Sequence, residues 1–157
     1  MKITFLTVGK TEDAYLKDGI EKYVKRLKHY TKLVIIEIDE LKNTKALSQE
    51  QQKAKEAELI LKKITPTDHV ILLDEKGIEF TSQQFAAYID KKAIGAVTSL
   101  VFIVGGPYGF DASVYARAND KLSLSAMTFS HQMVRLFFIE QLYRAYTIIK
   151  GEPYHHS

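Results

Sequence analysis

The chain contains no cysteine. That absence excludes disulfide bridges, thiolate metal sites and a cysteine nucleophile, and it leaves nothing that favours an oxidising compartment. A long apolar run is also missing at the N-terminus, where residues 1–8 precede Gly9-Lys10; this stretch is too short for a signal-peptide core or a membrane span. We therefore expect a cytoplasmic protein that does not insert into a membrane.

Several common site motifs are absent too. The five histidines form no His-x-x-x-His or His-Glu-x-x-His pattern, so we expect no metal site. The glycine-rich turn 105–109 is not followed by the Gly-Lys-Ser/Thr of a P-loop, which disfavours a phosphate cradle. Ser130-His131 lies outside any Gly-x-Ser-x-Gly elbow, so a serine nucleophile is not indicated.

What is present fits one ordinary hydrophobic core. The 157 residues are 46% hydrophobic and 26% charged, and no stretch of Gly, Ser or Pro is long enough to separate two domains. We expect a single domain spanning residues 1–157.

The small net charge of +3 is unevenly distributed. Residues 1–65 carry 14 Lys or Arg against 10 Asp or Glu, and the rest of the chain is nearly balanced. The excess is concentrated in segment 22–30, where a helix would turn Ile20, Val24 and Leu27 to the core. Two interpretations of the remaining basic residues stay open, a solvated helix face and a phosphate-facing patch.

Short apolar runs alternate with amphipathic stretches along the whole chain. The runs predict strands at 2–8, 33–38, 69–73, 100–104 and 122–125, with helices at 12–29, 48–63, 81–92, 111–118 and 131–150. Ser48 with Gln51, and Thr81 with Gln84, have capping-box spacing, and we expect Ala54, Ala57, Leu61 and Ile64 to mark one face of their helix. The alternation predicts an α/β fold with a mostly parallel sheet and helices on both faces.

The last predicted helix is apolar on almost every side. It could be a central helix buried within one domain, or it could form a subunit interface. We favour the interface, because helices of small α/β domains normally leave one face wet, and a two-fold contact would cover that face here.

Three loops should meet at one edge of the sheet, since open α/β sheets bind ligands beyond the C-terminal ends of their strands. These loops are 74–77, 105–109 and 125–130. The middle one, Gly-Gly-Pro-Tyr-Gly, allows a close approach of the backbone to a ligand, although a plain tight turn would explain it equally well. Gly151 and Pro153 are placed to stop the last helix, so the tail that follows has a defined direction.

Taken together, these motifs resemble one known family along essentially the whole chain. They are the opening KITFLTVGK, the run Phe102 to Gly109, the run Leu122 to Phe129 with His131, and Glu140 to Tyr146 with the closing Gly-Glu-Pro-Tyr-His. Their order, spacing and terminal placement are similar to those of the ribosomal RNA large-subunit methyltransferase H family.

That resemblance implies a SPOUT-class fold with a C-terminal trefoil knot and a homodimer that pairs through helix 131–150. It implies that the protein uses S-adenosylmethionine to methylate N3 of a pseudouridine in helix 69 of 23S rRNA. It also implies which residues contact the cofactor: Leu73, Gly106, Ser125, Ala126, Met127, Thr128, Phe129 and Ser130. One departure is visible, because family members commonly have Pro where this chain has Ser130, which bears on the stiffness of that loop.

The implied chemistry requires a site that stabilises a deprotonated base nitrogen. The candidates are Arg144, Tyr154 and His155. Arg144 could stabilise negative charge or hold an RNA phosphate, or only form a salt bridge. His155 could accept the proton or position the nucleotide, and Tyr154 could stack on the base, unless the tail merely packs across a dimer.

The substrate should be presented by an assembled ribosome or subunit, because so small and weakly basic a chain has no separate RNA-binding module. Two alternatives remain. The chain could be a non-catalytic RNA-binding or ribosome-assembly factor with this fold, or a SPOUT methyltransferase that acts on another RNA.

Overall fold

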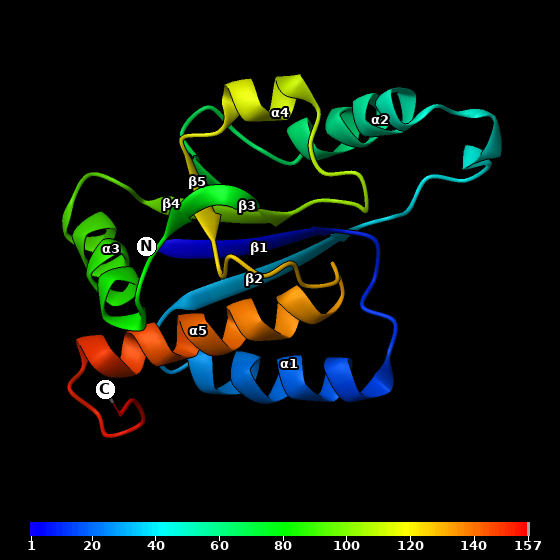
Figure 1. The fold of residues 1–157 in the computed structure, drawn as a ribbon. Coiled ribbons are helices and arrows are strands. Elements are labelled where there is room, and N and C mark those ends of the chain that lie inside the picture. Colours follow the sequence, from blue (N-terminus) through cyan, green and yellow to red (C-terminus); the bar gives the residue numbers. More distant parts are fainter. Residues whose placement is uncertain (157) are drawn as a thin grey trace.

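In the computed structural model, which describes residues 1–156, five parallel strands form one sheet in the order β2-β1-β4-β3-β5 (Figure 1). The predicted alternation of strands and helices is confirmed, with one added 3-10 turn. The elements are β1 Lys2–Val8, α1 Ala14–Leu27, β2 Lys32–Ile38, η1 Thr44–Ala46, α2 Gln49–Leu61, β3 His69–Glu79, α3 Ser82–Ile94, β4 Ser99–Val104, α4 Ala112–Arg117, β5 Asp120–Ser123 and α5 Met133–Ile149.

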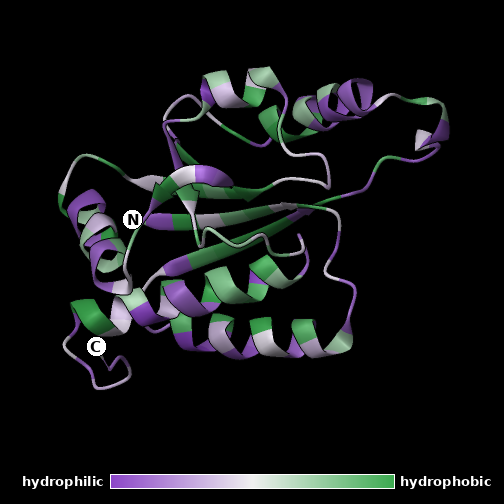
Figure 2. Ribbon diagram, viewed as in Figure 1, coloured by the Kyte–Doolittle hydropathy of each residue, from purple (hydrophilic) through white to green (hydrophobic). Residues whose placement is uncertain are grey.

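Helices cover both faces of the sheet, as the sequence predicts. Helices α1, α3 and α5 lie on one face, and α2 and α4 lie on the other (Figure 1). Side chains alternate accordingly along β4, where Phe102 faces the first group and Ile103 the second. The central strands are strongly hydrophobic and β4 is buried throughout, as expected for parallel strands covered on both sides (Figure 2).

Both predicted capping boxes are present. Ser48 Oγ accepts from Gln51 N at 3.1 Å and Thr81 Oγ1 accepts from Gln84 N at 3.1 Å. In return, the side-chain oxygen of each glutamine accepts from the backbone N–H of its cap residue at 2.9 Å. These local bonds fix the starts of α2 and α3, because each satisfies backbone N–H groups that have no partner within the helix.

Two details of the prediction are wrong. Segment 74–77 is not a loop after a strand but an irregular part of β3, whose pairing with β5 shifts register between Leu73 and Ile78. Gly77 permits this bulge, because a Cβ there would lie 2.6 Å from the backbone of β5. On α2, Ala54 is exposed and the buried stripe is Glu56, Ala57 and Ile60. Of the four expected residues, Ala57 is buried, Leu61 and Ile64 are half-buried and only Ala54 faces away.

Helix α5 packs between α1 and α3 and buries one side against the sheet. Phe138 is fully buried and stacks with Phe5 and Phe102 at centroid distances of 5.0 and 4.7 Å. Met133 and Phe137, in contrast, remain exposed on the outer side. The chain therefore buries part of α5 as a central helix but leaves an apolar surface uncovered.

A buried arginine joins α5 to the end of β1. Arg135 is 0% exposed and donates to the carbonyl oxygens of Val8, Gly9 and His131 and to Thr11 Oγ1, at 2.9 to 3.2 Å. Gln132 adds hydrogen bonds to Lys10 O and from Glu12 N. The turn between β1 and α1 is thus held by the first turn of α5.

Among the helices of residues 1–156, none has both the length and the apolar character that a membrane crossing requires.

Candidate functional site

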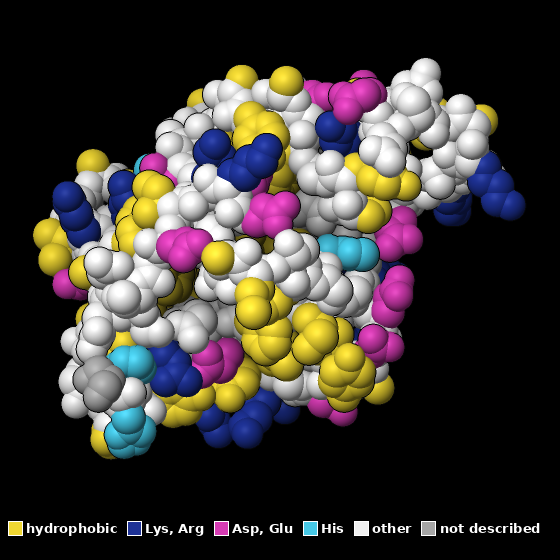
Figure 3. Space-filling model, in the orientation of Figure 1, with side chains coloured by type: hydrophobic (Ala, Val, Ile, Leu, Met, Phe, Trp, Pro, Cys, Tyr) yellow, Lys and Arg dark blue, Asp and Glu magenta, His cyan; other side chains and the backbone are white. Residues whose placement is uncertain are grey.

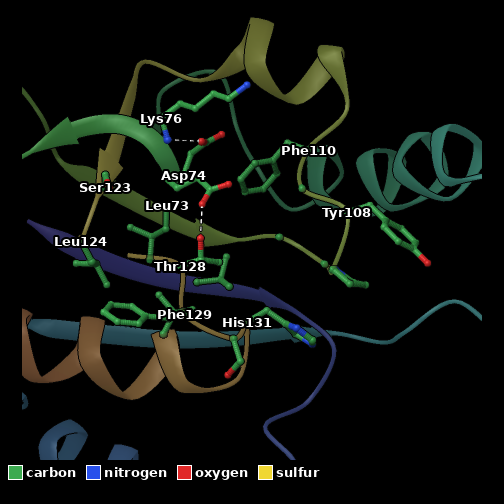
Figure 4. Close-up of a pocket in the computed structure, with 18 of the residues that line it drawn as sticks. Leu73, Asp74, Lys76, Tyr108, Phe110, Ser123, Leu124, Thr128, Phe129 and His131 are labelled. Atoms are coloured by element: carbon green, nitrogen blue, oxygen red, sulfur yellow. Dashed lines mark hydrogen bonds between the residues drawn. The ribbon is translucent and has the colours of Figure 1, made fainter. Parts of the chain in front are cut away.

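The main cavity opens beyond the C-terminal ends of β4 and β5, beside the irregular part of β3, and has a volume of about 710 Å³. This volume suits a small organic ligand, since such sites usually occupy about 300–1,000 Å³. Its wall consists of four segments, 73–76, 104–110, 122–125 and 127–131, together with Gln49, Tyr115 and Val134. The three segments nominated from the sequence therefore meet here (Figure 4).

Seven of the eight expected cofactor residues line the main cavity: Leu73, Gly106, Ser125, Met127, Thr128, Phe129 and Ser130. Ala126 is exposed and does not line it. Leu73 comes from the regular part of β3, and Thr128 and Phe129 come from the segment that leads to α5 (Figure 4). Tyr108, by contrast, points away from the centre of the cavity (Figure 4).

The glycine-rich turn is held closely from behind. A Cβ at Gly106 would lie 2.8 Å from both carboxylate oxygens of Glu56, and a Cβ at Gly105 would lie 3.0 Å from the ring of Phe110. Gly109 has φ of +82° and donates its N–H to Gly106 O at 3.2 Å. The turn therefore presents bare backbone to the cavity, which only glycine permits at these positions.

Glu56 is an acidic group in a nearly closed environment, with 5% of its surface exposed. Its hydrogen bond comes from Gln52 Nε2 at 3.3 Å. Burial raises the pKa of the Glu56 carboxyl, against the opposing effect of Gln52. The sequence analysis missed this residue, because a glutamate in an otherwise polar helix gives no pattern that distinguishes it from its exposed neighbours.

Hydrogen bonds between the wall segments close the rim of the main cavity. Thr128 Oγ1 donates to Glu75 Oε2 at 2.7 Å (Figure 4), and Tyr115 donates to Asp74. Burial and the bond to Asp74 together raise the pKa of Tyr115 to about 12. The lining holds two carboxylates, Asp74 and Glu75, against the single ammonium of Lys76. This balance suits a ligand that carries positive charge and disfavours a polyphosphate.

Ser130 has a local role that the sequence did not reveal. Its Oγ accepts from Met133 N at 3.0 Å and its carbonyl accepts from Val134 N at 3.0 Å, so it ties the turn that precedes α5 to the first residues of the helix. A proline could not supply that side-chain acceptor. In this chain a side-chain hydrogen bond to the first residue of α5 therefore stands where the resemblance described above implies a proline.

The three expected catalytic residues lie together at the other end of α5. We call Glu140, Arg144, Tyr154 and His155 the tail cluster. Glu140 Oε1 accepts from Arg144 Nη2 at 2.5 Å and from the Tyr154 hydroxyl at 2.9 Å. Arg144 Nη1 lies 3.1 Å from His155 Nδ1, and the guanidinium stacks on the Tyr154 ring, 4.8 Å from its centroid. Burial and the hydrogen bonds to Tyr23 and Glu140 raise the pKa of Tyr154 above its usual value.

Within one chain, the tail cluster does not reach the main cavity. Val134 lines the cavity and Arg144 follows ten residues later, which corresponds to about 15 Å along a helix of 1.5 Å rise per residue. Between them lies a side cavity of about 290 Å³, which shares Leu122, Ser123, Leu124 and Phe129 with the main cavity and is also lined by Glu140. The sequence predicts the two groups of residues but gives no information on this separation.

Comparisons with known proteins agree over the whole chain. The family described as "Predicted SPOUT methyltransferase" matches residues 1–155. A protein of Cytophaga hutchinsonii named "Ribosomal RNA large subunit methyltransferase H" is 58% identical over 156 residues, covering 99% of this chain and 100% of that protein. The protein of the same name from Parabacteroides distasonis is 55% identical over 157 residues and covers both chains fully.

A solved structure of a probable methylase family protein from Haemophilus influenzae Rd KW20 has a similar fold. Its TM-score is 0.52 at 13% identity, over 99% of this chain and 70% of that one.

Proposed function

The chain belongs to the ribosomal RNA large subunit methyltransferase H family of SPOUT methyltransferases, and from this membership we infer that it transfers a methyl group from S-adenosylmethionine to large-subunit rRNA. We propose that the target atom is N3 of a pseudouridine in helix 69 of 23S rRNA. The observation that carries the inference of methyl transfer is the main cavity, whose bare glycine backbone and acidic lining suit S-adenosylmethionine. The target atom is proposed from family membership.

The wall of the main cavity fits the cofactor in shape and charge. Leu73, Met127 and Phe129 supply apolar surface for an adenine ring, and the turn at Gly106 offers backbone groups that can read its edge. The carboxylates of Asp74 and Glu75, which line the cavity, favour a positively charged group in the ligand. When bound, S-adenosylmethionine supplies a methyl group on a positively charged sulfur. The chain's own task is then to hold the base in line with that group and to stabilise its deprotonated form.

A homodimer would complete this site. The uncovered apolar side of α5, with Met133 and Phe137, suits pairing with a second copy. Figure 3 shows hydrophobic side chains gathered over the first turns of α5. Charged and histidine side chains lie near the end of the helix. Antiparallel pairing of two α5 helices about a two-fold axis would bring the tail cluster of one protomer to the main cavity of its partner. That arrangement would join the two groups of site residues that one chain keeps about 15 Å apart.

The trefoil knot is also part of this proposal. Its support is the path of the chain after β5, which leaves the edge of the sheet, lines the main cavity and continues into α5 on the face opposite α4. Thr128 is tied to Glu75 and Gln132 to the turn after β1, so this segment runs between two other parts of the chain.

The basic face of α1 adjoins the tail cluster, which favours the phosphate-facing interpretation of that face. Tyr23 Oη lies 3.3 Å from Tyr154 Oη, and Arg26 stacks on Tyr23 and Tyr143 at 5.4 and 5.5 Å. Exposed lysines continue the positive surface at Lys22, Lys25 and Lys28. We propose that this face contacts the rRNA backbone of a ribosome or subunit in the cytoplasm.

The test is transfer of labelled methyl from S-adenosylmethionine to intact ribosomes, isolated large subunits and naked rRNA, with the product nucleoside mapped by mass spectrometry. We expect label at N3 of a helix 69 pseudouridine, with ribosomal particles preferred over naked rRNA. Label on a different nucleotide would identify another RNA target. Cofactor binding without transfer would contradict the substrate proposal, and loss of both would favour a non-catalytic assembly factor.

A further inference from the structure

The hydrogen bonds of the tail cluster also determine which ring nitrogen of His155 carries a proton. Arg144 Nη1 and His155 Nδ1 are 3.1 Å apart, a normal hydrogen-bond distance. A guanidinium has five N–H donors and no acceptor, and it stays protonated in proteins. His155 Nδ1 must therefore accept this bond through its lone pair. An imidazolium, or the tautomer with its proton on Nδ1, would place two N–H groups against each other.

We propose that Arg144 holds His155 as a neutral imidazole with its proton on Nε2, so that His155 donates a hydrogen bond to the target base and does not take the proton from N3. This proposal rests on the function inferred above for the tail cluster. Among residues 1–156, no hydrogen bond occupies His155 Nε2, so that N–H is free to meet a substrate.

The chemistry of the base suits such a donor. When N3 of a pseudouridine loses its proton to solvent water, the negative charge spreads onto the two flanking carbonyl oxygens. The N3 electron pair then forms the new bond to the methyl carbon, while the carbon–sulfur bond breaks and its electron pair stays on sulfur. A donor directed at one carbonyl oxygen stabilises the anion that attacks, which is the role of an oxyanion-hole group.

Glu140 is the anchor of this arrangement. Its Oε1 accepts from Arg144 Nη2, so the guanidinium is held at one edge by Glu140 and presents the other to His155. The same oxygen accepts from Tyr154, which joins the tail to the helix. We assign Glu140 as a positioning residue, because it acts through Arg144 and Tyr154.

The first experiment measures the tautomer directly and needs no RNA. Protein with ¹⁵N-labelled histidine is studied by NMR at neutral pH, and the His155 signals are assigned by their loss in His155→Gln. We expect an unprotonated Nδ1 and a protonated Nε2 in the wild type, and a shift of that population in Arg144→Ala. A proton on Nδ1, or an imidazolium, in the wild type would overturn the proposal even if the protein proves to methylate helix 69.

The second experiment separates a donor from a base by substitution. The glutamine amide of His155→Gln retains an N–H donor near Nε2 but cannot accept the N3 proton, whereas His155→Ala retains neither function. We expect kcat to fall about 10- to 100-fold in the alanine variant and only a few-fold in the glutamine variant, with unchanged cofactor affinity in both. The exposed neighbour serves as control, and His156→Gln should match the wild type. Equal loss in the glutamine and alanine variants would assign His155 as the base and overturn the proposal.

Discussion

Both carboxylate oxygens of Glu56 lie 2.8 Å from the point where a side chain at Gly106 would begin. Helix α2 therefore supports the glycine-rich turn from behind, and the turn has no room to move towards it. The close packing explains why the main cavity can be lined by bare backbone at this point.

Gly106→Ala should weaken cofactor binding at least 10-fold, or about 1.4 kcal/mol, because the new methyl group and the buried Glu56 carboxylate must move apart and any displacement of the turn narrows the cavity. Isothermal titration calorimetry with S-adenosylmethionine measures this effect. The double variant Glu56→Ala/Gly106→Ala, which removes the obstructing carboxylate, should recover part of the affinity. An unchanged dissociation constant in the single variant would show that the turn does not contact the cofactor.

Arg135→Met should destabilise the fold by about 3 kcal/mol, since the buried carbonyl oxygens of Val8 and Gly9 lose their arginine donor and Gly9 O keeps only the hydroxyl of Thr7. Urea unfolding followed by circular dichroism gives the free energy of unfolding. Lys150→Met, at an exposed position, is the matched control and should stay within about 0.5 kcal/mol of the wild type. A loss no larger than that of the control would mean that the turn after β1 is held by Gln132 alone.

The stability of the fold should depend on acidic pH through Asp120, the first residue of β5. Burial would raise the pKa of this carboxyl, but hydrogen bonds from Tyr88 at 2.6 Å and His69 at 2.8 Å outweigh burial and lower it. Because the folded-state pKa lies below the ordinary 3.8, the ionised form stabilises the fold above that pH, and this stabilisation is lost as pH falls through the folded-state value.

Asp120→Asn tests this linkage by comparison of urea unfolding at pH 7 and near pH 3. We expect the variant to be less stable than the wild type at pH 7, by less than about 1 kcal/mol for a partly exposed pair, and the difference to shrink in acid. A difference that grows in acid would have the wrong sign for this mechanism.

Two variants, each defective in one part of the site, should complement each other if the site is shared between protomers and the cofactor is kept too dilute to load Gly106→Ala. Gly106→Ala affects the main cavity and Arg144→Ala affects the tail cluster. When the two are unfolded together and refolded as a mixture, about half of the dimers are mixed and each has one intact site, which restores about a quarter of wild-type activity. Mixtures with no more activity than either variant would place the whole site within one chain.

If two copies pair through α5 as proposed, Phe137→Asp should leave the protein monomeric, because it puts a charge on the apolar side of α5 while the buried side is unchanged. Sedimentation velocity reports the oligomeric state. Tyr15→Asp is the control, since Tyr15 is 63% exposed and lies on α1 instead of α5. A dimer that persists in Phe137→Asp would move the interface elsewhere.

The sequence predicted what depends on local pattern. The capping boxes at Ser48 and Thr81, the parallel strands and the apolar character of α5 all follow from spacing or composition. The sequence did not predict which charged residues are buried. Arg135 and Glu56 are buried despite their charge, and only the folded chain shows that backbone carbonyls satisfy the first and that a glycine turn closes over the second.

The site could likewise be predicted only in part. The three wall segments follow from the direction of a parallel sheet, and Arg144, Tyr154 and His155 follow from family resemblance, whereas the place of Glu140 among them was not predicted. The bulge at Gly77 could not be anticipated, because it depends on the backbone of a strand that lies more than 40 positions away. The hydrogen bond from Arg144 to His155 depends on how the tail folds back after Gly151, which no periodicity records.

The length of helix α5 determines how far apart the two parts of the site lie. Its first turn lines the main cavity and its later turns carry Glu140 and Arg144, so the number of residues between them sets both the distance and the angle of the two functional ends. Inserting a single residue would advance the far end by about 1.5 Å and rotate it by about 100°, which would aim Arg144 at the sheet or at solvent. This stretch should therefore accept almost no change of length, even where the inserted residue is itself a good helix former.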